Sequence, residues 1–395
     1  MNMPEKYLDD IIEILSNNKQ CNFLALCLTP LHVNGVEATI RRLLDNGEHL
    51  EGYILLGTHD QTGRTVTKDM FSLKGSGFTY LDFRMRFRDG RNTNSLLDKI
   101  RALYFVDKTK AEDKFFVVYT TVDYHWVNYL AKSVLSERRI YYVRIDDGGG
   151  SYADPVKDAY RFAIYNGKKG AGIIHRILVY SKIRIRIMYE NLFTDKLIRN
   201  KQFLDNRLFT VNNFNHITGV NEDAKKYYIY GFEKSVDMSD RNDLLELKDS
   251  ILINTQCLQE NQIISNDIDF QLYREIVKCL QKKKIKVVIK PHPRELNPGK
   301  YKEIGAYIIS SSVTQESLLS YTEYNPKCII SIFSSTLLNA KGLFGVPSIS
   351  LAKIVAEMDI SSVLKTELFE YYEQYKDIIA FPESMNKLLE YIDNL

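Results

Sequence analysis

The chain has 395 residues, of which 45% are hydrophobic and 26% are charged, and this composition excludes a disordered or low-complexity protein. At the usual size of a domain, the length predicts two domains. Lys and Arg total 53 against 50 Asp and Glu, so the net charge of +3 alone gives no argument for a polyanionic partner.

The cysteines and the amino-terminal sequence limit the class further. Five cysteines form no CxxC pair, which argues against a disulfide framework or a cysteine zinc site. The opening MNMPEKYLDDIIEIL carries acids where a secretory signal is apolar, and no stretch contains enough consecutive apolar residues to span a membrane. We therefore expect a cytoplasmic protein that is attached to a membrane from one side at most.

The first half of the chain predicts a series of βα units. Residues 5–17 are typical of an amphipathic helix, and short apolar runs separated by helical stretches follow it. We expect strands at residues 22–28, 52–57, 78–83, 115–120 and 140–145. This alternation predicts a parallel sheet.

The same pattern returns in the second half, after a more polar stretch at about 212–249. We expect a helix at 269–283 and strands at 250–256, 285–290, 306–311, 328–333 and 346–352. The predicted fold class is α/β, with two facing Rossmann-like domains and a deep ligand cleft where the carboxyl ends of their strands meet. The predicted parts are a helical extension at 1–21, an amino-terminal domain at 22–215, a linker at 216–249, a carboxy-terminal domain at 250–381 and a final helix at 382–395.

An acidic pair ends the fifth expected strand. In IYYVRIDDGGGSY, Asp146 and Asp147 precede three glycines, which leave room for a substrate close to the carboxylates. Repulsion between the two charges would raise one pKa towards a value suited to a general base. An ordinary acidic turn is the alternative interpretation.

A histidine between two prolines ends the strand of KVVIKPHPRE. Pro291 and Pro293 restrict the backbone on both sides of His292, so the imidazole is held at the carboxyl end of this strand. Open α/β sheets bind ligands at this edge. A solvated loop histidine is the alternative.

Hydroxyl residues follow the strand CIISIF. Ser334, Ser335 and Thr336 begin a helix expected to end near Gly345, and hydroxyl and N–H groups at a helix amino terminus favour an anion such as phosphate. Glu316 stands at another expected helix start, where its carboxylate could accept both hydroxyls of a ribose. Helix capping alone would also explain both segments.

The sequence resembles bacterial sialyltransferases with two domains (GT-B architecture), including lipooligosaccharide sialyltransferases and capsular polysialyltransferases. The resemblance rests on three motifs in the same order: the acidic pair with its glycine, the His-Pro pair and the Ser-Ser pair. LCLTPLHVNGVEATI is similar to the Thr-Pro-Leu-Gln segment of several of these enzymes, with His32 in place of Gln. The resemblance extends over about residues 22–350 and implies two Rossmann-like domains that face each other across a cleft.

The resemblance also implies roles for single residues. Asp146, or Asp147 in its place, would be the general base for the acceptor hydroxyl, and His292 would protonate or hydrogen-bond the departing phosphate of a cytidine monophosphate (CMP) sugar. The implied donor-binding residues are Lys290, Pro293, Glu316, Ser334, Ser335 and Thr336. The implied contacts to acceptor or donor sugar are Thr29, Pro30, His32, Asp147 and Gly148.

No metal or other cofactor is expected. A sugar nucleotide with a single phosphate releases less charge than a diphosphate, so an imidazolium and a helix amino terminus could stabilise the leaving group. In-line attack through an oxocarbenium-like transition state would invert the anomeric centre. Asp267 and Asp269 form a DxD sequence of the kind that binds metal in other nucleotide-sugar enzymes, but they precede an expected helix and fit capping better.

Positive charge concentrates in one stretch. Residues 161–201 hold ten Lys or Arg and two acids, and residues 84–91 form a second basic cluster. Within the first stretch, KIRIRIMY fits either a strand or a helix with a mixed face. The charge predicts attraction to a polyanionic acceptor glycan or to the anionic cytoplasmic face of a bacterial inner membrane, and a solvated face is the alternative. No sequence pattern predicts binding to nucleic acid.

The sequence therefore predicts an inverting, metal-independent sialyltransferase that moves sialic acid from CMP-sialic acid to a hydroxyl of lipooligosaccharide or capsular polysaccharide. Transfer of another CMP-activated acid sugar such as Kdo, or of glycerophosphate from CDP-glycerol, stays open because those transferases also show Lys-x-His-Pro and serine-rich motifs. A non-catalytic polysaccharide-binding protein of capsule assembly is the alternative from another functional class.

Overall fold

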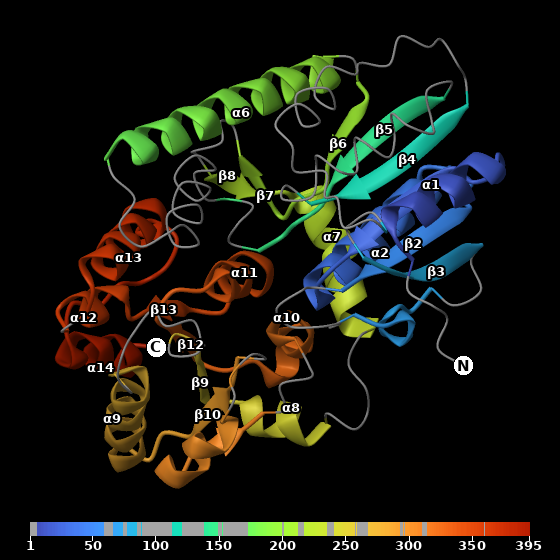
Figure 1. Ribbon diagram of the computed structural model, residues 1–395. Coiled ribbons are helices and arrows are strands. Elements are labelled where there is room, and N and C mark those ends of the chain that lie inside the picture. Colours follow the sequence, from blue (N-terminus) through green and yellow to red (C-terminus); the bar gives the residue numbers. More distant parts are fainter. Residues whose placement is uncertain are drawn as a thin grey trace. The chain divides into compact units, whose positions relative to one another are not determined.

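The computed structural model divides the chain into two units, Met1–Gly231 and Phe232–Leu395 (Figure 1). The relative positions of the units are not determined, so each is described by itself. The structure describes residues 6–58, 66–73, 77–84, 88, 113–120, 138–148, 152, 173–199, 201–211, 217–234, 241–256, 258, 268–292, 295, 297–309, 314–358 and 360–395.

A parallel sheet forms the centre of the first unit. Its strand order is β3-β2-β1-β4-β5-β6, so the direction of the strand order reverses between β1 and β4. The strands are β1 (Phe23–Cys27), β2 (Gly52–Gly57), β3 (Phe78–Phe83), β4 (Lys114–Tyr119), β5 (Arg139–Arg144) and β6 (Phe203–Asp205). A separate antiparallel pair consists of β7 (Phe209–Val211) and β8 (Ile217–Val220).

Two hydrophobic clusters cover the two faces of this sheet. Leu24 and Leu26 of β1 belong to the cluster that includes α1, whereas Phe23, Ala25 and Cys27 belong to the cluster that includes α2. This alternation follows because successive side chains of a strand point to opposite faces. The helices are α1 (Leu8–Asn17), α2 (Pro30–Asp45), α6 (Ile173–Arg199) and α7 (Glu222–Lys234), which continues into the second unit.

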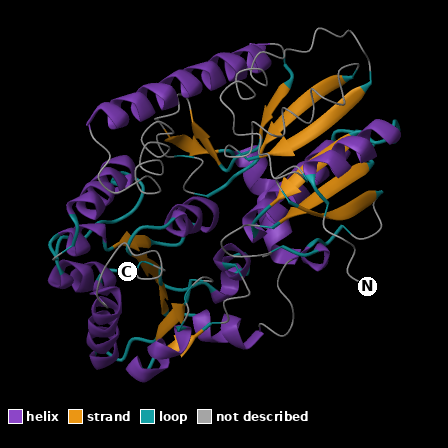
Figure 2. Ribbon diagram, viewed as in Figure 1, coloured by secondary structure: helices purple, strands orange, loops and turns teal. Residues whose placement is uncertain are grey.

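The second unit repeats this plan with the order β11-β10-β9-β12-β13. Its strands are β9 (Ile251–Asn254), β10 (Val287–Lys290), β11 (Tyr307–Ile308), β12 (Cys328–Ser331) and β13 (Ser348–Ser350). Its helices are α8 (Arg241–Leu247), α9 (Ile268–Lys282), α10 (Gln315–Leu319), α11 (Ser335–Phe344), α12 (Ala352–Ala356), α13 (Ser362–Tyr375) and α14 (Met385–Asp393). Figure 2 shows the strands of each unit with helices beside them.

The predicted fold class is confirmed. All the strands expected from the sequence are present, and both units have the strand order of a Rossmann-like fold. The chain thus has the two Rossmann-like units of the GT-B class. The cleft between them stays a prediction. None of the helices in the described residues combines the length and apolar character that crossing a bilayer requires.

The predicted parts differ from the observed units in three places. Residues 216–249, expected as a linker, contain β8, α7 and α8, and the boundary between the units lies within α7. The tyrosines of α7 made this segment look polar, yet Tyr228 is fully buried. The segments expected as an amino-terminal extension and a final helix supply Leu8 and Leu388 to the cores of the two units.

Candidate active site

The predicted motifs lie where parallel strands end. In the first unit, Thr29 follows β1 and Asp146 follows β5, with β4 between these strands. In the second unit, His292 follows β10 and Ser334 follows β12, with β9 between them. Open α/β sheets bind ligands at this edge, beside the point where the strand order reverses.

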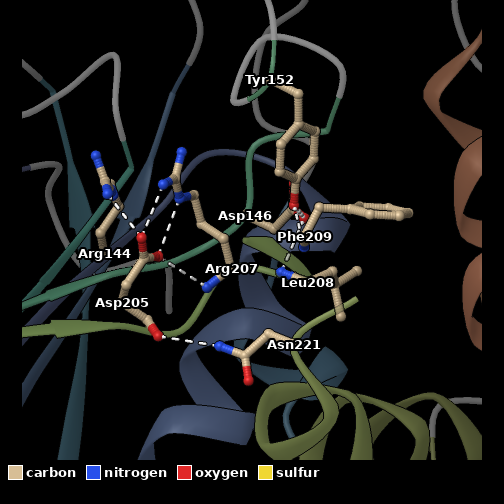
Figure 3. A network of polar contacts seen from close by, with 8 residues as sticks. All are labelled: Arg144, Asp146, Tyr152, Asp205, Arg207, Leu208, Phe209 and Asn221. Atoms are coloured by element: carbon tan, nitrogen blue, oxygen red, sulfur yellow. Dashed lines mark hydrogen bonds and ion pairs between the residues drawn. The ribbon is translucent and has the colours of Figure 1, made fainter. Parts of the chain in front are cut away.

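Asp146 is fully buried at the end of β5. Its carboxylate accepts hydrogen bonds from the N–H group of Leu208 at 3.4 Å and from the Tyr152 hydroxyl (Figure 3). The N–H group of Gly148 also donates to this carboxylate, at 2.6 Å. Burial raises the pKa of Asp146 to about 6, although the hydrogen bonds from Tyr152 and Gly148 oppose the shift. A pKa in this range suits a carboxyl group that exchanges a proton near neutral pH.

The backbone of Asp146 is held by helix α7. Its N–H group donates to the Tyr228 hydroxyl oxygen at 3.2 Å. A Cβ atom at Gly35 of α2 would lie 2.7 Å from that same oxygen, so glycine permits the approach of α7. Sequence reasoning missed Tyr152, Leu208 and Tyr228 because nothing in their local sequence marks a contact with a distant strand.

Asp147 has different surroundings from its neighbour. Its side chain is 21% exposed, and its Oδ1 lies 2.5 Å from Nε2 of the buried His32. The N–H group of Leu28 donates to Nδ1 of the same ring at 3.1 Å, so the ring proton lies on Nε2 and is donated to Asp147. His32 thus fixes the orientation of the carboxylate that is partly open to solvent.

The segment that carries His32 is a helix start. Thr29 is the N-cap of α2, and its hydroxyl oxygen accepts the N–H of His32 at 3.4 Å, while Pro30 lies in the first turn. These two residues hold the helix end that positions His32. Gly148, with a φ of 71°, lets the chain turn back so that its N–H reaches Asp146.

A third carboxylate, in addition to Asp146 and Asp147, was not predicted from the sequence. Asp205, at the end of β6, binds Arg144 at 2.7 Å and Arg207 at 2.9 Å and 2.7 Å (Figure 3). Although burial alone would raise it, the two guanidinium groups lower the pKa of Asp205 to about 2. This carboxylate stays ionised as part of the fold, whereas that of Asp146 can exchange a proton.

In the second unit, the turn that carries His292 is fixed through its backbone. The N–H of His292 donates to Thr255 Oγ1 at 3.0 Å and to Glu295 Oε2 at 3.2 Å. Buried Glu295 also accepts the hydroxyls of Thr255 at 2.5 Å and Tyr301 at 2.6 Å, and burial raises the pKa of Glu295. His292 itself is half-buried and Lys290 is buried, while Pro293 lies outside the described residues.

The hydroxyl segment forms the amino terminus of α11. Ser334 is the N-cap, and its hydroxyl oxygen accepts the N–H of Thr336 at 3.3 Å and lies 2.9 Å from the Thr336 hydroxyl. The Tyr371 hydroxyl contacts both the N–H and the C=O of Ser334, at 3.2 Å and 2.9 Å. Ser335 begins the helix, so this rigid end carries the positive pole of the helix dipole.

Glu316 lies in the first turn of α10, as the sequence predicts. It is buried, and its Oε1 accepts the side-chain N–H of Asn339 at 2.9 Å. This bond joins α10 to α11. The contact of Glu316 with a ribose stays a prediction.

Three polar residues at the end of β9 connect these motifs, and sequence reasoning missed them. Thr255 holds the His292 turn, Asn254 donates to Thr336 Oγ1 at 3.2 Å, and the Gln256 amide binds both backbone groups of Phe333. Asn254 Oδ1 is buried and has no hydrogen-bond partner among the described residues. The sequence does contain a feature that could have identified them, because the polar residues NTQ directly follow an apolar run. The other motifs show the same feature.

Within the described residues, no group of three or more His, Cys, Asp or Glu side chains could hold a metal ion. Asp267 of the DxD sequence lies outside the described residues, as do 161–172, 85–87 and 89–91 of the basic stretches. Asp269 is buried in the first turn of α9, where it accepts the N–H of Phe270 at 2.8 Å.

Several solved structures are similar to this chain over most of its length. UDP-GlcNAc 2-epimerase from Methanocaldococcus jannaschii is 13% identical with a TM-score of 0.50, covering 94% of this chain and 91% of that one. An α/β-galactoside α-2,3-sialyltransferase from the luminous marine bacterium Photobacterium phosphoreum is 11% identical with a TM-score of 0.45, covering 94% and 98%. A sialyltransferase from Photobacterium damselae, whose residues 113–497 correspond to a GT-B domain, is 9% identical with a TM-score of 0.43, covering 91% and 99%.

The sequence comparison is more specific than these distant structural likenesses. Curated proteins give no match in sequence. A family model described as alpha-2,8-polysialyltransferase (POLYST) matches residues 97–353, a range that contains the acidic pair, the His292 turn and the amino terminus of α11. Because this match covers more than half of the chain, the protein belongs to the alpha-2,8-polysialyltransferase family and is a glycosyltransferase.

Proposed function

We propose that the protein transfers sialic acid from CMP-sialic acid, with inversion and without a metal, to a hydroxyl of a sialylated surface glycan. The proposal rests on one observation, which is that the carboxyl edges of the two sheets carry different types of residue. In the first unit, Asp146, whose pKa is raised, follows a strand, and in the second unit a histidine turn and a capped helix amino terminus follow strands. The family supports sialic acid as the transferred sugar.

The second unit supplies the donor site of this proposal. A phosphate at the amino terminus of α11 would accept hydrogen bonds from backbone N–H groups and from the hydroxyls of Ser335 and Thr336. His292 would donate to the leaving phosphate as its charge develops, which is when such a contact contributes most to rate. The buried acceptor Asn254 Oδ1 would bind an N–H or O–H group of the nucleoside.

The first unit supplies the base. The pKa of about 6 supports Asp146, because that carboxyl group binds and releases protons near neutral pH. Partial exposure and the fixed contact to His32 support Asp147, because an acceptor hydroxyl must reach the base without disturbing the fold. In either case the attacking oxygen would approach opposite the phosphate and give the inverted product.

The acceptor follows from the family and from the charge of the chain. The family description supports extension of a sialylated end through α2,8 linkages, so lipooligosaccharide or capsular polysaccharide that already carries sialic acid is the proposed acceptor. Each added residue would make this acceptor more anionic. The ten basic residues at 161–201 support attraction of such a polyanion.

The test is transfer from a panel of donors by the purified chain, with and without EDTA. CMP-sialic acid should support transfer to a short sialylated oligosaccharide in both conditions, and CMP-Kdo and CDP-glycerol should not. Transfer only from CDP-glycerol would refute the proposal. Calorimetry with CMP addresses the non-catalytic alternative, which requires glycan binding without affinity for the nucleotide.

A further inference from the structure

Helix α6 carries apolar side chains on two opposite faces. Among its described residues, Ile183 and Ile187 are buried, as expected for the face that packs on protein. A second set is 49% to 64% exposed, and its helical spacing places it on the other face. This set, called the α6 stripe, consists of Ile177, Leu178, Ile185, Met188 and Leu192.

The α6 stripe is bordered by positive charge. At about 100° of rotation per residue, Lys182 and Arg184 fall on its two edges, and both are exposed. The Arg184 guanidinium lies 5.8 Å from the ring centroid of the exposed Tyr180. The side chains of α6 that the structure describes include three cations, the third being Arg199, and no acid.

The α6 stripe lies within residues 177–192, and contiguous exposed apolar side chains often mark a surface that binds a partner or a membrane. The helix has 27 residues and is drawn in green in Figure 1. An apolar centre with basic edges matches a layer of anionic phospholipids, where apolar side chains enter the acyl boundary and long cationic side chains reach the phosphates. Tyrosine is also favoured at this depth.

A second copy of the chain fits this surface less well. A symmetric dimer through the α6 stripe would bring the edges with Lys182 and Arg184 of one copy close to the same cations of the other. Like charges at an interface oppose association, whereas anionic headgroups attract both edges. The charge therefore favours lipid over self-association.

We propose that the α6 stripe docks the protein on an anionic phospholipid bilayer, with α6 lying along the surface. This inference does not depend on the proposed reaction, because it concerns a helix surface and not the sheet edges. Docking would place the enzyme beside acceptor glycans built on lipid anchors. The cations at the edges would attract the anionic headgroups from a distance. The apolar side chains would then insert at the boundary between the headgroups and the acyl chains.

Vesicle sedimentation of the full chain tests the proposal. Wild type should sediment with vesicles of phosphatidylethanolamine and phosphatidylglycerol, but not with phosphatidylcholine alone, and about 0.5 M NaCl should release most of it. The stripe variant Ile185→Ser/Met188→Ser/Leu192→Ser should bind at least about fivefold less. The matched control Leu44→Ser/Leu245→Ser/Phe369→Ser changes exposed apolar residues elsewhere and should bind as wild type does.

A second readout does not rely on loss of binding. In a Trp126→Phe background, which removes the one Trp of the chain, Leu192→Trp should show blue-shifted emission with anionic vesicles. Equal binding by the stripe variant, or unshifted emission of bound Leu192→Trp, would overturn the proposal. So would an α6-dependent dimer in sedimentation velocity without vesicle binding. Because vesicle binding needs no donor, these results are separate from failure of the proposed reaction.

Discussion

The two units share a strand order but differ in what ends their strands. In the first unit two aspartates lie at the carboxyl ends of strands, and their surroundings shift their pKa values in opposite directions. Asp146 lies among neutral donors and has its pKa raised, while Asp205 lies between two guanidinium groups and has its pKa lowered. In the second unit the corresponding edge holds hydroxyl and amide groups around a helix amino terminus. In the proposed reaction, one topology would thus support proton transfer in one unit and anion binding in the other.

Neutralising the acids one at a time tests whether the first unit supplies the base, and it should have the largest effect. Asp146→Asn and Asp147→Asn each keep the side-chain size, and the one that removes the base should lower turnover by about 10³-fold. CMP binding, measured by calorimetry, should stay within about threefold of wild type for both, since the proposed nucleotide site lies in the other unit. If both variants keep more than half of the wild-type rate, the acidic edge has no catalytic role.

The matching change in the second unit is His292→Ala. It should lower turnover by about 10²-fold with a smaller effect on CMP affinity, because the proposed contact would strengthen as the phosphate departs. His49→Ala removes an exposed histidine of the first unit and serves as the control. A loss of CMP affinity as large as the loss of turnover would assign His292 to binding alone.

The pH dependence of kcat/KM tests which of Asp146 and Asp147 is the base. A general base must be deprotonated, and burial raises the pKa of Asp146 to about 6. If Asp146 is the base, kcat/KM should fall about tenfold for each pH unit below 6. A profile that is flat from pH 7 to pH 5 would exclude Asp146 and leave Asp147.

The smallest expected effect concerns the cap of α11. Ser334→Ala should cost about 1 kcal/mol of stability and weaken CMP binding several-fold. Ser384→Ala removes the equivalent cap of α14 and should cost similar stability without changing CMP affinity. Thermal unfolding and calorimetry on the same samples separate the two effects. Equal CMP affinity in both variants would show that the amino terminus of α11 is not part of the donor site.

Much of this fold could be predicted because its strands are short apolar runs between turn residues. β2 and β3 appear at the residues that the sequence predicts. The starts of α10 and α11 were also predictable, since Thr314 and Ser334 are good capping residues just before apolar helices.

The surroundings of the site residues could not be predicted. Asp146 and Asp147 are adjacent and chemically identical, and only the packing of Tyr152 and Leu208 against one and of His32 against the other distinguishes them. Such contacts join segments far apart in the chain and leave no local pattern. KIRIRIMY was ambiguous for a different reason, because a helix with two apolar faces lacks the single stripe that identifies most helices.

The most direct test of the proposed reaction is a crystal structure of the chain with CMP and a sialylated acceptor oligosaccharide. The proposed reaction requires an oxygen of Asp146 or Asp147 within about 3.2 Å of the acceptor hydroxyl, and His292 equally close to the phosphate of the same complex. An acceptor bound far from both aspartates, or a phosphate that His292 does not contact, would contradict it.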